Sequence, residues 1–523
     1  MSALMFELPL EPAGVPRGRA MIERAEWAAR AFATYDAATV QRIVEAAARA
    51  AADHAREFAE QAVAETGFGV VEHKILKNIA CSTGLIETYR AHDYVSARVD
   101  EGSKIVEVPR PAGVVLALTP STNPVATVYF KVLLALMTRN AIVVCPHPYA
   151  KKVCAAAAHV MAEAAVAAGA PDGCIQVVEE PSIPLVNALM TDERTDVILA
   201  TGGTAMVRSA YSSGNPAIGV GPGNVPVLVD RTADLAKTAE RIVESKAFDN
   251  SILCTNESVL IVEDAVADQL VAQMRKAGAY LLDDIERDRV RELIFPGGHF
   301  DVRWVGKSAA DIAAAAEVKV PPRTRVLLAP FELAVPEEML AHEKLCPVLG
   351  VVRVPTAARG IEVAKAVLRI SGAGHSAAIH STDSATIMAF ASAVRVLRVT
   401  VNVGNSLGSA GIHTNLAPSM TIGTGFFGRS SVGENLEPKH LVNYTRIAYN
   451  ADDRERMGDF TALQPWTAPS GPVPAYPHAS NERVDSITHL STVRPDALGG
   501  STDELREEIR RLIIDELTNL MKG

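Results

Sequence analysis

DVILATGGTAMVRSAY, residues 196–211, contains an apolar run, a pair of glycines and the start of a helix near Thr204. This order is typical of a buried strand that passes through a tight turn into a helix. Gly202 and Gly203 allow the backbone to approach a ligand closely, and the free N–H groups of the helix start favour a phosphate. A glycine pair is equally an ordinary connection between strand and helix, so both interpretations stay open.

The alternation of strand and helix continues on both sides of this stretch. Upstream, apolar runs that resemble strands occupy 105–109, 113–118, 141–145 and 174–178, with helices expected at 150–168 and 183–190. Downstream, a second series has strands at 226–230, 258–263, 326–329, 348–354, 376–380 and 398–403, with helices near 232–247, 264–277 and 361–369. A chain of 523 residues exceeds the size of one core. The sequence therefore predicts two doubly wound α/β domains with parallel sheets.

One long amphipathic helix is predicted before the first of these strands. Residues 39–66 carry apolar positions at helical spacing, follow a possible cap at Thr39 and stop at Gly67.

Composition argues against several classes of partner. The chain has 51 Lys and Arg against 61 Asp and Glu, a net charge of −10, and no basic run, which disfavours nucleic acid and anionic membranes. It has neither a signal-like N-terminus nor about 18 uninterrupted apolar residues, so a cytoplasmic protein is expected. The six cysteines form no C-x-x-C pair, which disfavours a disulfide framework and a zinc knuckle. No metal site is predicted.

The last seventy residues differ in composition from the rest. Five prolines lie between residues 465 and 477, in a polar stretch that extends to Gly499-Gly500 and predicts a linker without a core. Ser501 and Glu504 then have the spacing of a capping box. Apolar residues of 501–523 gather on one side of the helix that begins there, so this helix needs a partner.

Two polar turns contain residues suited to acyl chemistry. FDNSILCTNE, 248–257, places Cys254 in a turn just before a strand, and GVVLALTPSTNP, 113–124, ends a buried strand at Asn123. A cysteine there can serve as a nucleophile and an Asn amide can stabilise an oxyanion. A free cysteine is more often a small buried apolar residue, and Asn before Pro is common in ordinary turns.

Taken together, the motifs resemble those of the CoA-acylating aldehyde dehydrogenases. FDNSILCTNE, LATGGTAM, TPSTNP, EKLCPVLG and SGAGHSAAIH occur in the order and at roughly the distances seen in that family. Over about residues 20–450 the chain looks most like the propionaldehyde and acetaldehyde dehydrogenases of bacterial microcompartments and the aldehyde-dehydrogenase half of bifunctional aldehyde-alcohol dehydrogenases. The resemblance implies an aldehyde dehydrogenase-like fold with an oligomerisation arm, and NAD and coenzyme A as cofactor and co-substrate.

The resemblance also implies roles for individual residues. Cys254 matches the thiol nucleophile, and Asn123 with the backbone N–H of Cys254 matches the oxyanion hole. His375 matches a histidine near the nucleophile, where a catalytic role and a structural role are both open. The residues that match the cofactor site are Pro120, His147, Thr201, Gly202, Gly203, Thr204 and Glu343.

The choice between NAD and NADP depends on the segment CPHPYAKK, residues 145–152. Hydrolytic relatives often have a lysine here beside the adenosine ribose, and either His147, Lys151 or Lys152 takes that place. Because a 2′-phosphate normally requires a nearby positive group, NAD is favoured over NADP.

The fate of the acyl group separates two candidate activities. Hydrolytic aldehyde dehydrogenases use a glutamate in an ELGGK-like segment to activate water, whereas the corresponding GVGPGNVP, 219–226, has no carboxylate. Thiolysis by CoA is therefore predicted, with an acyl-CoA as product and a reversible reaction. A hydrolytic enzyme and an inactive scaffold remain the alternatives, and the aldehyde is propionaldehyde, acetaldehyde, lactaldehyde or sulfoacetaldehyde, with propionaldehyde favoured by resemblance.

Domain boundaries and partners follow from the same resemblance. We expect a mainly NAD-binding domain at 1–235 with an oligomerisation hairpin near 94–110, a catalytic cysteine domain at 236–430, and a return strand at 431–450. The linker then covers 451–500, and the helix at 501–523 resembles the encapsulation peptides that bind microcompartment shell proteins. Packing on the enzyme's own surface or a coiled coil with a sister subunit are alternatives for that helix. A homodimer or dimer of dimers in the lumen of a bacterial microcompartment is expected.

Overall fold

The computed structural model describes residue 12, residues 14–471 and residue 476. Unit 1, Met1–Pro474, contains all the elements below, and the predicted helix at 501–523 lies outside the described residues. No helix of the described part is long and apolar enough to cross a bilayer.

The first parallel sheet has five strands, with order β5-β4-β3-β6-β7. They are β5 (Ile175–Val177), β4 (Ala141–Pro146), β3 (Val114–Thr119), β6 (Val197–Ala200) and β7 (Ala217–Gly219). Every pairing in this sheet is parallel. Strand order reverses at β3, so the carboxyl ends of β3 and β6 form the crevice in which such sheets bind ligands.

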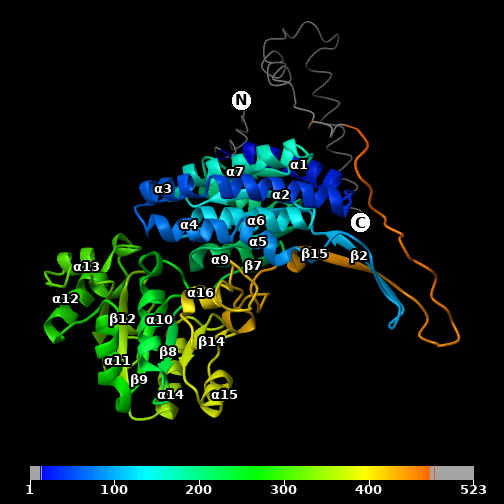
Figure 1. Ribbon diagram of the computed structural model, residues 1–523. Helices are drawn as coiled ribbons and strands as arrows, with labels where there is room; N and C mark the ends of the chain where they lie inside the picture. The colour runs from blue at the N-terminus through cyan, green and yellow to red at the C-terminus, as the bar shows by residue number, and fades with distance from the viewer. Residues whose placement is uncertain (1–11, 13, 472–475, 477–523) are drawn as a thin grey trace, which may run out of the picture. The chain divides into compact units, whose positions relative to one another are not determined.

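Some of the helices up to residue 211 pack directly on the first sheet, and the others pack on those helices or on one another. Figure 1 shows most of the helices of this part of the chain gathered together. They are α1 (Val15–Phe32), α2 (Ala37–Asp53), α3 (Ala55–Thr66), α4 (Val71–Ala80), α5 (Thr83–Tyr89), α6 (Pro124–Met137), α7 (Lys151–Ala167), α8 (Ile183–Thr191) and α9 (Thr204–Tyr211). α6 is buried along its whole length, and α2 packs against both α6 and α7.

The predicted single helix at 39–66 is wrong in two respects. His54 has φ −98° and ψ 10°, and its Nδ1 lies 2.8 Å from the carbonyl oxygen of Ala50, so the helix breaks there into α2 and α3. The break lets α2 pack on α6 while α3 packs on α4. The cap is Asp36, whose carboxylate accepts from the N–H of Thr39 at 2.9 Å, and not Thr39 itself.

The second parallel sheet has seven strands, in the order β10-β11-β12-β9-β8-β13-β14. They are β10 (Ala279–Leu281), β11 (Val326–Pro330), β12 (Val348–Val354), β9 (Glu257–Glu263), β8 (Val225–Val229), β13 (Ala377–His380) and β14 (Val399–Val401). By strand pairing, the chain changes sheet between β7 and β8. The domain boundaries of the sequence analysis stay predictions.

Alternate residues of the second sheet enter two separate cores. Val227 and Val229 belong to the core that contains α10 (Leu235–Ala247) and α11 (Asp264–Lys276), whereas Leu228 belongs to the opposite one. The opposite core contains α12 (Asp284–Ile294), α13 (Ala309–Ala315), α14 (Ala357–Ile370) and α15 (Ser384–Ala393). Because strand side chains alternate between faces, the sheet is covered on both sides. The predicted doubly wound α/β fold is confirmed.

A three-stranded antiparallel sheet has the order β1-β2-β15. Its strands are β1 (Arg98–Asp100), β2 (Ile105–Pro111) and β15 (Val442–Ala448), and Figure 1 shows β2 and β15 side by side. β1 and β2 lie in the region predicted as an oligomerisation hairpin, and β15 lies in the predicted return strand. The remaining elements that the structure describes are α16 (Asn405–Ser409) and short 3-10 helices. The 3-10 helices are η1 (Pro148–Ala150), η2 (Phe248–Ser251), η3 (Pro296–Gly298), η4 (Val302–Trp304), η5 (Met339–Ala341), η6 (Phe426–Gly428) and η7 (Pro438–Leu441).

Candidate active site

One cavity of about 430 Å³ contains nearly all the residues that the sequence singled out. Its walls include nine of the ten predicted site residues: Pro120, Asn123, His147, Thr201, Gly202, Gly203, Thr204, Cys254 and Glu343. Segments after β3 and β6 of the first sheet meet the turn before β9 of the second. The cavity therefore draws on both parallel sheets.

His375, the tenth residue, lies behind the cysteine. Its Nε2 is 3.3 Å from Sγ of Cys254, and its Nδ1 is 3.0 Å from Oγ of Ser376. Ser376 Oγ in turn accepts a hydrogen bond from Nδ2 of Asn405 at 3.0 Å. The imidazole is completely buried, so its orientation is set by these contacts. Cys254 and His375 form a nucleophile and base pair in geometric terms.

Both members of this pair are uncharged near neutral pH. Burial raises the pKa of the Cys254 thiol to about 12, and the carboxyl of Glu343 adds to that rise, although Sγ faces the cavity. Burial lowers the pKa of His375 to about 3, and the nearby guanidinium of Arg398 lowers it further. At neutral pH the pair is therefore a thiol beside a neutral imidazole, with Nε2 of His375 facing the sulfur.

Arg398 fixes the backbone around His375. Its guanidinium donates to the carbonyl oxygens of Gly374 and His375, at 2.8 and 2.9 Å from Nη2, and also to that of Gly423. Sequence reasoning missed this residue, because a buried arginine that binds backbone carbonyls leaves no local pattern.

The chain reaches Cys254 through a strained turn. Asp249, Asn250 and Ser251 have φ values of 50°, 51° and 63°, in the left-handed region that residues other than glycine rarely adopt. Each such residue costs about 1–3 kcal/mol unless the surroundings hold it, and such strain is concentrated at functional sites. Asn250 is held in this conformation by a hydrogen bond, in which its Nδ2 donates to the carbonyl oxygen of Gly306 at 2.9 Å.

The segment 219–226 lies directly against the nucleophile. A Cβ on Gly223 would lie 2.1 Å from the carbonyl oxygen of Cys254 and 3.1 Å from Oε1 of Glu343, so only glycine fits. Gly221 and Pro222 also line the cavity. Among the described lining residues, Glu343 is the one carboxylate, and burial raises its pKa to about 8. The charge of Lys246, which is fully buried, counteracts this rise in the pKa of Glu343 more than any other group does.

The glycine turn before α9 has room for an anion. A Cβ on Gly203 would meet no atom within 4 Å, and α9 begins with no side-chain cap on its free N–H groups. A phosphate group fits such a helix start. These features are compatible with a dinucleotide whose pyrophosphate lies beside Gly203.

Of the three basic candidates near the adenosine position, only His147 lines the cavity in the described residues. Lys151 instead forms an ion pair with Glu180, and the backbone N–H of Lys152 donates to Glu65 at 2.9 Å.

Other features of the described chain stand apart from this site. A groove of about 730 Å³ between α1 and α7 contains none of the predicted site residues. The five cysteines other than Cys254 are buried. No group of three His, Cys, Asp or Glu side chains within the described residues is arranged to hold a metal ion.

Comparison with known proteins places the chain. Residues 13–287 match the profile of the Aldehyde dehydrogenase family. The chain is 37% identical over 431 residues to the succinate-semialdehyde dehydrogenase (acetylating) of Clostridium kluyveri, which covers 82% of this chain and 95% of that protein. The chain belongs to the aldehyde dehydrogenase family.

A longer relative shows the same similarity. The aldehyde-alcohol dehydrogenase of Clostridium acetobutylicum is 40% identical over 438 residues, which are 82% of this chain and 50% of that protein. The chain thus spans about half the length of the aldehyde-alcohol dehydrogenases that it matches.

Solved structures of the family agree with the fold. An acetylating aldehyde dehydrogenase from Geobacillus thermoglucosidasius has a TM-score of 0.82 at 38% identity, covering 84% of this chain and 98% of that one. A propionaldehyde dehydrogenase from the fucose utilisation bacterial microcompartment of Clostridium phytofermentans has a TM-score of 0.75 at 28% identity, covering 83% and 97%. The predicted aldehyde dehydrogenase-like fold is confirmed.

Proposed function

We propose that this protein oxidises a short-chain aldehyde to its acyl-CoA, with NAD⁺ as oxidant and coenzyme A as acyl acceptor. The observation that carries the proposal is the 3.3 Å contact between Cys254 Sγ and His375 Nε2 at the wall of a cavity that also contains Asn123 and the Gly202–Gly203 turn. Acetylating relatives over most of the chain support the choice of CoA.

The first half of the reaction forms a thioester on Cys254. Sγ attacks the carbonyl carbon of the aldehyde while its proton passes to Nε2 of His375, with Nδ1 donating to Ser376 Oγ. Asn123 and the backbone N–H of Cys254 stabilise the oxyanion. The Gly202–Gly203 turn and Glu343 would hold the nicotinamide cofactor, which would supply the acceptor for the hydride of this carbon. Loss of the hydride leaves an acyl group on sulfur.

The second half transfers the acyl group to CoA. The CoA thiol attacks the thioester carbonyl, the C–S bond to Cys254 breaks, and the cysteine sulfur takes back the proton from His375. The CoA thiol gives up its own proton to solvent, so one proton and one reduced cofactor are formed per acyl-CoA. Because one thioester replaces another, the step is nearly thermoneutral and reversible.

The acceptor is tested by following NADH absorbance on adding propionaldehyde and NAD⁺, with and without CoA. We expect turnover that requires CoA, and no turnover of Cys254→Ala. Cys81→Ala, a change at a buried cysteine away from the cavity, is the matched control and retains activity. An inactive scaffold would show no turnover under either condition.

Hydrolysis is the second candidate activity, and Glu343 is the observation that favours it. Glu343 lines the same cavity as Cys254, and its ionised form, which becomes abundant as pH approaches its pKa of about 8, could accept a proton from water. Equal turnover with and without CoA, lost in Glu343→Gln, would support hydrolysis and contradict the proposed acylating activity.

The lining of the cavity favours an uncharged aldehyde such as propionaldehyde. Apolar side chains from several segments line it, including Ile252, Leu253, Val302, Leu345, Met420 and Ile422. No lysine or arginine is among the lining residues that the structure describes. Burying a sulfonate without a partner is costly, so kcat/KM for sulfoacetaldehyde should be about 100-fold below that for propionaldehyde. The kcat/KM values for acetaldehyde and lactaldehyde would be measured in the same assay. A higher kcat/KM for sulfoacetaldehyde than for propionaldehyde would contradict the choice of an uncharged aldehyde.

We also propose that the protein is a dimer or a dimer of dimers, and that residues 501–523 direct it into a bacterial microcompartment by binding shell proteins. Exposed apolar residues on the small sheet, Val99 and Ile447, support association through β1, β2 and β15. Light scattering after gel filtration measures the mass. Co-purification of full-length protein with assembled shells, lost when 501–523 is removed, tests the second part.

A further inference from the structure

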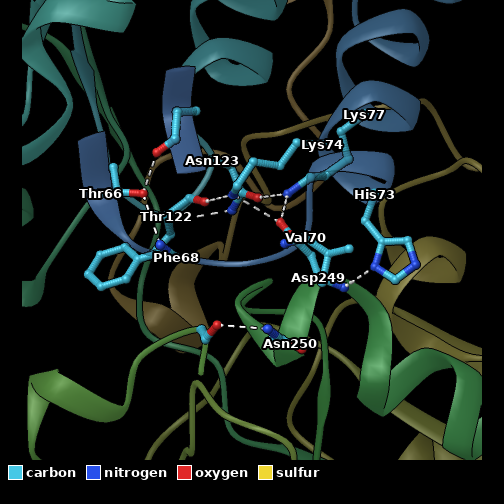
Figure 2. A network of polar contacts seen from close by, with 12 residues as sticks. Thr66, Phe68, Val70, His73, Lys74, Lys77, Thr122, Asn123, Asp249 and Asn250 are labelled. Atoms are coloured by element: carbon cyan, nitrogen blue, oxygen red, sulfur yellow. Dashed lines mark hydrogen bonds and ion pairs between the residues drawn. The ribbon is translucent and has the colours of Figure 1, made fainter. Parts of the chain in front are cut away.

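A loop of the first domain crosses to the strained turn that precedes Cys254. In Figure 2, Val70, His73, Lys74 and Lys77 lie around Asp249. The carboxylate of Asp249 accepts from the backbone N–H of Val70 at 2.6 Å, from Nζ of Lys74 at 3.2 Å and from Nζ of Lys77. Asp249 and both lysines are buried, so these are strong, specific contacts.

The fit around Asp249 leaves no spare room. A Cβ on Gly69 would lie 2.2 Å from Oδ1 of Asp249, and Gly69 has a φ of +80°, so another residue there would displace the carboxylate. The backbone N–H of Asp249 donates to Nδ1 of His73 at 2.8 Å, and the imidazole of His73 stacks on Phe248 at 4.5 Å between centroids. The turn is thus held by both its side chain and its backbone.

Lys77 joins this turn to Asn123. Its Nζ donates to Oδ1 of Asn123 as well as to the carboxylate of Asp249. An ammonium has donors and no acceptor, so the flipped amide, with Nδ2 toward Lys77, would lose this bond and meet a positive charge. Lys77 therefore sets which end of the Asn123 amide faces away from it. Nδ2, at the other end of the amide, donates to Oγ1 of Thr122 at 3.4 Å, and Asn123 lines the cavity.

We infer that Lys77 and Asp249 are positioning residues that couple the two halves of the oxyanion hole. Lys77 holds the Asn123 amide with its N–H groups available to the oxyanion, and Asp249 ties that lysine to the turn that places Cys254. Neither side chain lines the cavity, so both act through other residues. This inference rests on the proposed function, because only an aldehyde or acyl substrate would form the oxyanion that Asn123 and the N–H of Cys254 stabilise.

A double-mutant cycle between Lys77 and Asn123 tests the inference. We would measure steady-state kcat and KM for propionaldehyde with NAD⁺ and CoA in the full-length protein, together with the first-turnover rate of NADH formation. Lys77→Met should lower kcat about 10- to 100-fold and change KM less than about threefold, because the lost contact acts on the transition state. Asn123→Ala should lower kcat about 100-fold or more. The kcat of the double variant should be no more than about threefold below the kcat of Asn123→Ala.

A second buried lysine gives the matched control. Lys131 lies in α6, where Nζ donates to the carbonyl oxygens of Leu118 and Leu199, both at 2.8 Å. The fold-loss in kcat caused by Lys131→Met should be independent of Asn123, so that the double variant loses the product of the two single fold-losses. If the effects of Lys77→Met and Asn123→Ala also multiply, Lys77 does not act through Asn123 and the inference is overturned.

If Lys77→Met does not fold, which circular dichroism detects, variants closer in shape to the original residues replace it. Lys77→Gln and Asp249→Asn retain hydrogen-bonding groups and enter the same cycle with the same expected non-additivity. Loss of folding in all three variants would show that the pair serves the fold itself, which also overturns the inference. Absence of turnover in the unmodified protein, with and without CoA, would instead contradict the proposed function.

Discussion

At the scale of single residues, the state of the Cys254 thiol decides how the enzyme begins its reaction. A pKa of about 12 for Cys254 and about 3 for His375 means a thiol and a neutral imidazole at pH 7. Because the thiol pKa is raised, the thiolate fraction should grow tenfold for each pH unit throughout the range from 6 to 9. Iodoacetamide should therefore inactivate the ligand-free protein about 1000 times faster at pH 9 than at pH 6.

Mass spectrometry identifies the labelled residue, and Cys254→Ala is the control, since the other five cysteines are buried. A rate that stays flat between pH 6 and pH 8 would show a thiolate–imidazolium pair already formed, contrary to the prediction.

The carboxyl of Glu343 gives a prediction about stability. Its pKa is raised to about 8 in the folded protein, so the folded state binds this proton more tightly than the unfolded state. The resulting stabilisation is complete below about pH 4.5 and is lost as pH rises through 8. Glu343→Gln cannot ionise, so the variant does not lose this stability as pH rises. At pH 8.5 the variant should be more stable by roughly 2–3 kcal/mol, allowing for partial exposure of the carboxylate.

Urea denaturation at pH 5 and pH 8.5 measures this difference, which should nearly vanish at the lower pH. A variant that is equally destabilised at both values would show that Glu343 is needed for packing whatever its charge.

The candidate site illustrates which residues a sequence can predict. Cys254, Asn123 and Glu343 stand in short motifs, and the structure places them on one cavity. Lys77, Asp249 and Arg398 were not predicted as site residues, because their partners lie far away in sequence. Lys77 and Asp249, for example, are 172 positions apart. Such contacts depend on how the two domains meet, and no local periodicity records them.

At the scale of elements, strands were predicted better than helix boundaries. The apolar runs at 141–145 and 348–354 are strands β4 and β12, which are buried except at Arg353, because a parallel strand covered on both faces needs a nearly continuous apolar segment. The break at His54 could not be predicted, since its side chain bonds to Ala50 within a sequence that is otherwise helical throughout. α6 is buried on every side and lacks the one-sided apolar stripe that marks a surface helix.

The segment after β15 behaves differently from the coreless linker that its composition predicts. Between 451 and 471 the structure describes no helix or strand, yet the ring of Trp466 lies 4.4 Å from the guanidinium carbon of buried Arg139. Arg139 also donates to the carbonyl oxygens of Ala33 at 2.7 Å and Pro109 at 3.0 Å. A cation–π contact away from water contributes about 2 kcal/mol.

Trp466→Ala should therefore lower the free energy of unfolding by about 2 kcal/mol. Phe460→Ala is the matched control in the same segment, because Phe460 contacts Tyr449 and not Arg139. Phe460→Ala should lower the free energy of unfolding by less than about 1 kcal/mol. Equal losses in urea denaturation would contradict a specific role for the Trp466–Arg139 contact.

At the scale of the whole molecule, catalysis and the C-terminal segment should be separable. All residues that line the cavity lie between Pro120 and Ile422, inside unit 1. Two contacts of the segment after β15 join it to the part of the chain that carries the first sheet: Trp466 lies against Arg139, and the N–H of Thr467 donates to the carbonyl oxygen of Thr34. A protein ending at residue 476 keeps both contacts. Its kcat and KM should stay within about twofold of the full chain, because no lining residue is removed.

A second truncation, after Ala448, removes Trp466 and supplies the contrast. This shorter protein should retain the cavity residues. Its free energy of unfolding, measured by urea denaturation, should be lower than that of the full chain by at least the roughly 2 kcal/mol expected for Trp466→Ala. Both proteins would be assayed for CoA-dependent NADH formation and for retention by assembled shells. Loss of activity on removal of 477–523 would show that this segment contributes to the enzyme itself. Retained activity with lost shell binding would assign catalysis to unit 1 and targeting to the segment beyond it.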